Sequence, residues 1–312
     1  MKIAFVFPGQ GSQTVGMMDA YTELSLIRET FTEASDILQQ DLWSLTSNGP
    51  EDSLNLTTNT QPVILTADVA IYRAWRQAGG IRPHFMAGHS LGEYAALVAA
   101  ESLTFADALK LVRYRATVMQ ATVPEGTGGM AAIVGLDDDM VSSVCTEVMN
   151  VIPGTSLEPA NFNAPGQVVI AGHIQAITQA VTLAKSKGAK LAVILPMSIP
   201  SHCSLMQPAA EKLAILLKEI QLQPPQVPVL HNADVGSHSE ATSIREILAR
   251  QLYNPVRWTE TIRAIASQGV KHVVECGPGK VLSGLNRRID KSLENIALTD
   301  PDSFHKTIEA LK

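Results

Sequence analysis

The sequence predicts an α/β fold in which a small βαββαβ unit lies within a larger α/β part. A length of 312 residues suffices for two average domains. A composition of 46% hydrophobic, 17% charged and 5% aromatic residues is typical of globular α/β proteins and excludes a disordered or fibrous chain. Residues 84–99 have the order strand, glycine-rich turn, helix. Residues 126–197 alternate as strand, helix, two strands, helix, strand, which predicts a small ferredoxin-like unit.

The remaining elements are predicted from apolar runs and from the proline and glycine residues that end them. Residues 3–7 predict a buried first strand that Pro8 ends, too short for a signal peptide. Residues 60–79 predict a helix with Pro62 in its first turn and glycines after its end. Other strands outside the small unit are predicted at 84–87, 227–231 and 272–276.

Two further helices begin with an apparent capping box. The first covers about 104–121 and opens with Thr104 followed three residues later by Asp107. The second opens with Ser243 and Glu246 and extends to about residue 253. Both helices carry a polar residue within an apolar stripe.

Charge and cysteine content exclude several classes of protein. A formal net charge of -6 argues against broad binding to nucleic acid or to anionic membranes. The three cysteines form no C-x-x-C pair, which excludes a zinc knuckle or a disulfide framework and favours a reducing, cytoplasmic location. No apolar run approaches the length of about 18 residues that a membrane span needs. We expect a monomer.

No cofactor is predicted. The segment FPGQGSQTVG has Thr14 where a dinucleotide-binding G-x-G-x-x-G needs glycine, and GPGK at 277–280 lacks the first glycine of a P-loop. No H-E-x-x-H motif or cluster of metal ligands is present. We therefore expect neither a nucleotide nor a metal cofactor.

Ser90 is the candidate nucleophile. Gly88-His89-Ser90-Leu91-Gly92 matches G-x-S-x-G, in which glycines permit a sharp strand-to-helix turn that exposes the serine hydroxyl. At a helix N-terminus, free N–H groups and the helix dipole favour a developing oxyanion. The alternative is a simple glycine turn with a capping serine. The turn at Gly9–Gly11 follows the first strand and is expected to supply a second oxyanion donor.

A serine nucleophile needs a base, and the chain has eight histidines. The His89 side chain should point away from Ser90 on a sharp turn. His202 follows Ser90 in the chain order that such elbows use. From the residues alone, a structural role for His202 stays equally open.

Arg115 falls inside the apolar stripe of its helix, whereas Arg113 does not and is predicted to be a solvated surface charge. A buried guanidinium needs an anion, so Arg115 pairs either with an acidic side chain or with a substrate carboxylate. Both interpretations stay open.

Gln251 also faces inward, near the end of the second capped helix. Because Pro255 ends that helix, a carbonyl near Gln251 lacks an intrahelical partner and could accept a hydrogen bond from an imidazole. Ordinary hydrogen bonding of the Gln251 side chain in the core is the alternative.

Together the motifs resemble one family over nearly the whole chain. FPGQGSQTVGM, GHSLGEYAALVAA, RATVMQ, GGMAAIVGL, ANFNAPGQVVIAG, IPSHCSLM, QLYNPVRWTETI and GPGKVLSGLNRRI are similar to the malonyl-CoA:acyl-carrier-protein transacylases of bacterial type II fatty-acid synthesis. The resemblance implies an α/β-hydrolase-like catalytic domain, residues 1–125 and 198–312, interrupted by the ferredoxin-like domain 126–197. Ala116 and Ala233 depart from the glycine and valine usual in relatives.

The resemblance also implies site residues. Ser90 is the nucleophile, His202 the base, and the main-chain carbonyl of Gln251 the third member of a triad. Backbone N–H groups of Gln10 and Leu91 bind the oxyanion. A further role falls to Arg115, which binds the free malonyl carboxylate and so excludes plain acyl groups.

The implied reaction is a ping-pong transfer of the malonyl group from malonyl-CoA to acyl carrier protein through a malonyl-serine ester. Carrier proteins of this type are acidic, so we expect a basic docking patch of Lys280, Arg287 and Arg288, with Lys187 and Lys190. Alternatives are a serine thioester hydrolase, an acyltransferase for another extender unit in polyketide synthesis, and a non-enzymatic carrier-protein or scaffold module.

Overall fold

The structure is a computed structural model that describes residues 2–197 and 199–311. Its strands are β1 (Lys2–Phe7), β2 (Phe85–Gly88), β3 (Gly128–Val134), β4 (Leu157–Ala164), β5 (Gln167–His173), β6 (Leu191–Ile194), β7 (Val229–Leu230), β8 (Val270–Glu275) and β9 (Glu294–Ala297). Its α-helices are α1 (Ser25–Leu38), α2 (Leu42–Asn48), α3 (Glu51–Asn55), α4 (Thr57–Gln77), α5 (Gly92–Ala99), α6 (Phe105–Thr122), α7 (Asp138–Val151), α8 (Ile174–Ser186), α9 (Gln207–Glu219), α10 (Ala241–Arg250), α11 (Trp258–Ser267), α12 (Val281–Ile289) and α13 (Pro301–Ala310).

The larger part is built on a parallel sheet of five strands in the order β7-β2-β1-β8-β9. The central strand β1 is the predicted first strand, and its residues from Ile3 to Phe7 are fully buried. In the register of the sheet, Phe7 pairs with Gly88 and Val6 with Glu275. The loops that follow β1, β2 and β8 therefore leave the same edge of the sheet, which is where open α/β sheets place their sites.

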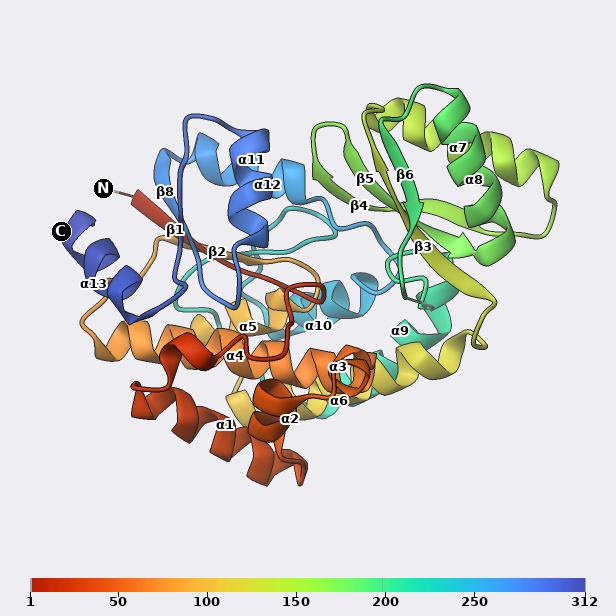
Figure 1. The fold of residues 1–312 in the computed structure, drawn as a ribbon. Helices are drawn as coiled ribbons and strands as arrows, with labels where there is room; N and C mark the ends of the chain where they lie inside the picture. The colour runs from red at the N-terminus through yellow and green to blue at the C-terminus, as the bar shows by residue number, and fades with distance from the viewer. Residues whose placement is uncertain (1, 198, 312) are drawn as a thin grey trace.

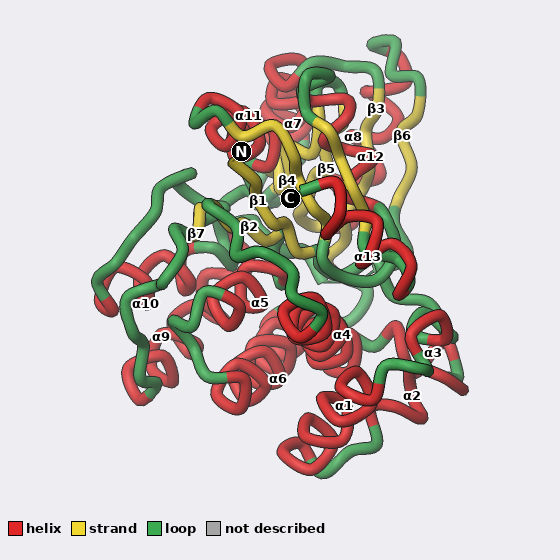
Figure 2. The backbone as a smooth tube through the Cα atoms, turned by 90° about the vertical axis from the view of Figure 1, so that its left-hand side faces the viewer, coloured by secondary structure: helices red, strands yellow, loops and turns green. Residues whose placement is uncertain are grey.

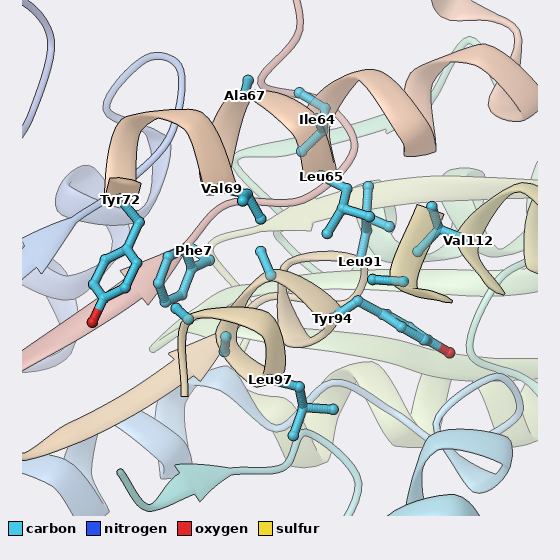
Figure 3. Packing of buried hydrophobic residues seen from close by; sticks show 14 of the residues in the cluster. Phe7, Ile64, Leu65, Ala67, Val69, Tyr72, Leu91, Tyr94, Leu97 and Val112 are labelled. Carbon is cyan, nitrogen blue, oxygen red and sulfur yellow. The ribbon is translucent and has the colours of Figure 1, made fainter. Parts of the chain in front are cut away.

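Helices cover both faces of this sheet (Figures 1 and 2). One face packs against α1, α4, α5, α6, α9 and α10 in the main core, and the other packs against α11 and α12. The short helix α5 contacts β1, β2 and α4, and its Tyr94 and Leu97 belong to the same buried cluster as Phe7, Leu65 and Val69 (Figure 3). This packing fixes the start of α5 against the end of β1.

Residues 128–194 form a second, antiparallel sheet in the order β4-β5-β3-β6, with α7 and α8 on one face (Figure 1). The predicted order of strand, helix, two strands, helix, strand is confirmed. The other face presents Met130 and Val169 toward Cys203 of the larger part. Main-chain hydrogen bonds join Val256 to Ala160 and to Phe162 at the edge strand β4, both with N···O distances of 2.9 Å.

The helix ends correct two predictions. Helix α4 begins at Thr57, so Pro62 lies inside it and not in its first turn. The N-cap of α10 is Glu240, and Ser243 lies in the first turn, so the predicted capping box is wrong. The cap at Thr104 is confirmed, because its side chain accepts a hydrogen bond from the Asp107 N–H at 3.1 Å. None of the helices in the described residues is sufficiently long and apolar to span a bilayer.

Candidate active site

Ser90 occupies a strained turn between β2 and α5. Its φ angle of 51° is in the left-handed region, which residues other than glycine rarely adopt. The flanking glycines make this turn possible. A Cβ atom on Gly88 would lie 1.9 Å from the carbonyl carbon of Gly92, and one on Gly92 would lie 2.1 Å from the Phe7 oxygen. The predicted elbow is therefore present, and the Ser90 side chain stays partly exposed.

His202 meets Ser90 from the loop before α9. Its Nε2 lies 2.7 Å from Ser90 Oγ, although the two residues are 112 positions apart. His202 also has a left-handed φ angle, 64°, and its N–H donates to the Leu252 carbonyl at 2.9 Å. The structure thus holds the imidazole beside the serine hydroxyl. His89 points away, as predicted, with its Nε2 2.8 Å from Asn163 Oδ1.

The other imidazole nitrogen contacts the main chain. His202 Nδ1 lies 2.8 Å from the Gln251 carbonyl oxygen. This carbonyl is free because the residue four positions later is Pro255, which has no N–H to donate. With Nδ1–H donating to the carbonyl, Nε2 carries the lone pair that faces Ser90.

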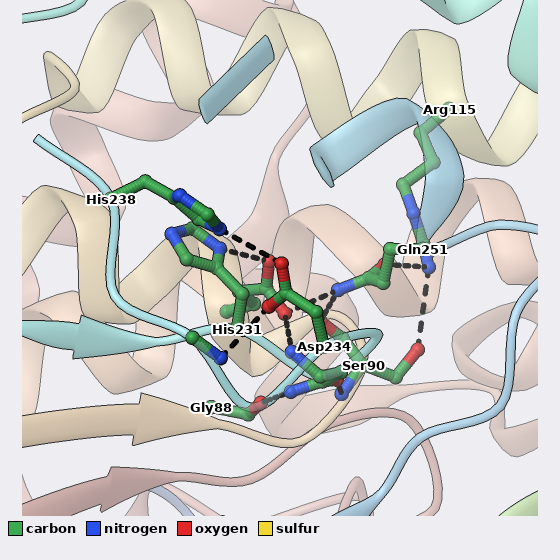
Figure 4. A network of polar contacts seen from close by, with 10 residues as sticks. Gly88, Ser90, Arg115, His231, Asp234, His238 and Gln251 are labelled. Carbon is green, nitrogen blue, oxygen red and sulfur yellow. Dashed lines mark hydrogen bonds and ion pairs between the residues drawn. The ribbon is translucent and has the colours of Figure 1, made fainter. Parts of the chain in front are cut away.

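Arg115 is buried beside the nucleophile, with 1% of its surface exposed. Its Nη1 donates to Gln61 Oε1 at 2.9 Å, and its Nη2 lies 3.0 Å from Gln251 Oε1 and 3.3 Å from Ser90 Oγ (Figure 4). No ion pair joins Arg115 to an acidic side chain among residues 2–197 and 199–311. Of the two predicted interpretations, the internal ion pair is absent from this part of the chain.

Two pKa values follow from this environment. Burial first, and then the positive charge of Arg115, lower the pKa of His202 to about 3. The imidazole is therefore neutral at physiological pH and can accept a proton. Burial also lowers the pKa of Arg115, which Tyr94 and Glu93 partly oppose. Because guanidinium titrates only at very high pH, Arg115 keeps its charge.

The loop after β1 lies against the elbow. A Cβ atom on Gly9 would approach the His89 oxygen to 2.3 Å and the Leu91 nitrogen to 3.6 Å. The main-chain N–H groups of Gln10 and Leu91 have no hydrogen-bond acceptor within the part of the chain that the structure describes. Both residues line the chamber that contains Ser90. They can therefore donate to a ligand.

The chamber at Ser90 has a volume of about 80 Å³. It is lined by Gln10, His89, Ser90, Leu91, Arg115, Met119, Met130, Asn161, Met197, Ser201 and His202. It shares several of these residues with a cleft of about 650 Å³, which the small sheet lines on one side and the loop after β1, α3 and the start of α4 line on the other. A small inner chamber with a long approach suits a short acyl group on an extended carrier.

Sequence reasoning missed several polar residues of the site. Gln61 binds Arg115, whereas Glu93 and Asn232 form a buried network behind Ser90. A glutamate inside the apolar, alanine-rich start of α5 was the one available signal. Arg113 is half-buried and donates to Gln40, so its prediction as a solvated charge is wrong. No group of three or more His, Cys, Asp and Glu in the described residues could hold a metal ion.

Comparison with known proteins places the chain among the acyl transferases. The model of the acyl transferase domain family matches residues 4–298. The malonyl CoA-acyl carrier protein transacylase of Escherichia coli K12 is 53% identical over 309 residues, 99% of each chain. The solved transacylase of Coxiella burnetii superposes with a TM-score of 0.98 at 48% identity, covering 100% of this chain and 98% of that one.

A second similar structure is a malonyl-transacylase in complex with a type II polyketide-synthase acyl-carrier protein. It has a TM-score of 0.97 and 50% identity, with coverage of 99% and 100%. The chain is thus an acyl transferase of α/β fold, and it belongs to the malonyl CoA-acyl carrier protein transacylase family.

Proposed function

We propose that this chain transfers the malonyl group from malonyl-CoA to the phosphopantetheine thiol of acyl carrier protein, in the supply of fatty-acid synthesis. The observation that carries the proposal is the chain of contacts from Gln251 O through His202 to Ser90 Oγ, beside a buried Arg115 that forms no ion pair with an acidic side chain of the described residues. The transacylase names of the relatives support the same substrate and acceptor.

The first half-reaction acylates Ser90. Its Oγ attacks the thioester carbon while His202 Nε2 takes the hydroxyl proton. The N–H groups of Gln10 and Leu91 stabilise the oxyanion of the tetrahedral intermediate. When the intermediate collapses, the carbon–sulfur bond breaks, the proton on His202 passes to the coenzyme A sulfur, and a malonyl-serine ester remains.

The second half-reaction reverses these roles. The thiol of acyl carrier protein gives its proton to His202 Nε2 and attacks the ester carbon. Collapse breaks the bond to Ser90 Oγ, which takes the proton back from His202. The Gln251 carbonyl stabilises the imidazolium formed in each half-reaction, because it accepts the Nδ1–H.

Arg115 supplies the selectivity in this proposal. Its guanidinium would form a bidentate pair with the malonyl carboxylate, and an acetyl group would leave it without an anion. Hydrogen bonds to Gln61 and Gln251 hold the guanidinium in place.

The carrier protein would dock beside α12. Lys280, Arg287 and Arg288 lie on or next to this helix, whose Val281, Leu282 and Leu285 line a cavity of about 130 Å³ next to Gln10 and His89. Arg288 donates to Gln167, which pairs with Val134 of the small sheet, and Lys190 donates its N–H to the same Val134. The Lys187 ammonium pairs with Glu147, so it contributes less charge to the patch.

The finer architecture belongs to the same proposal. The five-stranded part, residues 1–125 and 198–312, would be an α/β-hydrolase-like catalytic domain, and 126–197 a ferredoxin-like domain. The limit at residue 198 lies outside the described residues. Separate hydrophobic cores on the two sheets support the division. We further propose a cytoplasmic location, since Cys145, Cys203 and Cys276 are free buried thiols, as expected in a reducing compartment. We also propose that the protein is a monomer and uses neither a metal nor a nucleotide cofactor.

The decisive experiment is intact-protein mass spectrometry after mixing with malonyl-CoA. A malonyl adduct that persists, and that acyl carrier protein then removes as malonylated carrier, is expected. Turnover to free malonate without carrier would instead identify a hydrolase. The Ser90→Ala variant should form no adduct. Preferential transfer from methylmalonyl-CoA would favour another extender unit, and full activity of Ser90→Ala in cells would indicate a scaffold role.

A further inference from the structure

A buried polar network lies behind Ser90, and the proposed mechanism uses only part of it. Asn232 follows β7, and Glu93 lies in the first turn of α5 (residues 92–99). Both side chains are fully buried. In Figure 4, Gly88 and Ser90 lie along the bottom of this network, His231 to its left and Gln251 to its right. Neither Asn232 nor Glu93 lines the chamber, so neither can touch the substrate.

The side-chain amide of Asn232 binds two backbone groups of the turn that leads into the nucleophile. Its Oδ1 accepts a hydrogen bond from the Ser90 N–H at 2.7 Å. Its Nδ2 donates to the Gly88 carbonyl at 2.6 Å. A left-handed turn between a strand and a helix leaves such backbone groups without regular partners, and burial makes unpaired groups costly. An amide supplies one acceptor and one donor in the required arrangement.

Glu93 anchors the main chain of Asn232. Its Oε2 accepts from the Asn232 N–H at 2.9 Å and from Gln251 Nε2 at 3.0 Å, and its Oε1 lies 2.7 Å from His231 Nδ1. Gln251 Nε2 also donates to the Ser90 carbonyl at 2.9 Å. The N–H and C=O of Ser90 are therefore bound by the side chains of two residues that both contact the Glu93 carboxylate, Asn232 through its main-chain N–H and Gln251 through its side-chain amide.

We propose that Asn232 is a positioning residue for the nucleophile, and that its amide holds the backbone of Gly88 and Ser90 in the conformation that aims Ser90 Oγ at His202. The inference rests on the proposed role of Ser90. Without the amide, the strained turn relaxes and carries Oγ and the adjacent Leu91 N–H away from their positions. The rate of acylation falls, whereas binding of malonyl-CoA is retained because the chamber and Arg115 are intact.

The test is the Asn232→Ala variant in a single-turnover reaction with malonyl-CoA, followed by intact mass. We expect acylation at least about tenfold slower than in the native chain, since small misplacements of reacting groups cost this much or more. Malonyl-CoA affinity is measured by calorimetry in a Ser90→Ala background, with and without Asn232→Ala, and should agree within about twofold. Asn295→Ala, which removes a similarly buried amide on β9 far from the elbow, should acylate at the native rate.

A second variant, Asn232→Asp, serves if Asn232→Ala does not fold, because aspartate keeps the shape of the asparagine side chain. A protonated aspartate can donate to the Gly88 carbonyl as the amide does, but an ionised one opposes that oxygen. The acylation rate of Asn232→Asp, divided by that of the native chain at the same pH, should therefore fall as pH rises. The titratable or charged groups around this position are Glu93 and His231, with Asp234 and His238 beside His231, His89 and His202 at the elbow, and Arg115 beyond Gln251. All are present in both proteins, so the ratio of the two rates isolates residue 232.

The proposal is overturned if Asn232→Ala acylates at the native rate, or if acylation and binding fall together with the folded fraction measured by near-ultraviolet circular dichroism. If only Asn232→Asp folds, a rate ratio that does not change with pH overturns it. Failure of the native chain to form any malonyl adduct would instead reject the proposed function, so the two failures are distinguishable.

Discussion

Replacing Arg115 with alanine should remove the preference for malonyl over acetyl groups. The Arg115 side chain is 1% exposed, and among the described residues its guanidinium donates to uncharged partners, Gln61, Gln251 and Ser90, and faces the Tyr94 ring. Its desolvation is thus uncompensated by an ion pair until a carboxylate arrives. An acetyl group brings no anion, so the loss should fall on malonyl transfer alone.

The magnitude follows from the burial of this charge. Two unit charges about 4 Å apart attract by about 4 kcal/mol at an effective dielectric constant of about 20. Allowing for imperfect geometry, we expect Arg115→Ala to lose about 3 to 4 kcal/mol of transition-state stabilisation, or about 10²- to 10³-fold in kcat/KM for malonyl-CoA. Arg115→Lys keeps the charge but not the planar fork, and should retain part of the preference.

The assay compares acyl transfer to acyl carrier protein from malonyl-CoA, acetyl-CoA and methylmalonyl-CoA. Arg113→Ala is the matched control, because Arg113 lies on the same helix α6 (residues 105–122) and donates to Gln40, away from the chamber. Its malonyl preference should be unchanged. A malonyl-to-acetyl ratio in Arg115→Ala equal to that of the native chain would refute the assigned role of the guanidinium.

Three further predictions follow. Because burial and Arg115 lower the pKa of His202 to about 3, kcat/KM should stay level as pH falls through the ordinary histidine range, and an acid limb with a midpoint near 6.5 would contradict this. The Gly92→Ala variant places a Cβ 2.1 Å from a backbone oxygen and should lower the free energy of unfolding by at least about 2 kcal/mol in urea titrations, whereas Gly284→Ala, with open space around it, should raise it by about 0.5 kcal/mol; equal stability of the two would be unexpected. Reversing the charges of Arg287 and Arg288 should slow transfer to acyl carrier protein about tenfold at low salt without slowing acylation by malonyl-CoA, and unchanged transfer would remove them from the docking patch.

Features set by neighbouring residues were predictable from the sequence. The elbow at Ser90 follows from two glycines between a strand and a helix, and the structure confirms that turn. The free carbonyl of Gln251 follows from Pro255 four residues later. The inward position of Arg115 follows from the apolar stripe of its helix, and the residue is buried.

Features that depend on distant segments were not predictable. Asn232 and Glu93 are 139 positions apart, and only the parallel register of β2 and β7 brings them together. The start of α10 was misplaced because an S-x-x-E pattern inside a helix looks the same as one at its beginning; Glu240 caps the helix without a side-chain hydrogen bond. The choice between an acidic side chain and a substrate carboxylate as the partner of Arg115 likewise depends on the folded structure, since no local sequence pattern shows whether a distant acidic residue lies beside the guanidinium.

The charge that selects the substrate also acts on the base, and this coupling gives a last prediction. Arg115 is the second largest cause of the lowered pKa of His202, after burial. Removing the positive charge in Arg115→Ala should therefore raise that pKa, although burial keeps it below the ordinary value of about 6.5. The acid limb of kcat/KM measured with acetyl-CoA, which does not need the guanidinium, should move to higher pH in Arg115→Ala and stay in place in Arg113→Ala. A limb at the same pH in all three proteins would mean that the two residues do not interact electrostatically across Ser90. If the acid limb shifts in this way, a malonyl carboxylate that neutralises the charge of Arg115 must also raise the pKa of His202. Binding of the substrate would then make His202 a stronger base.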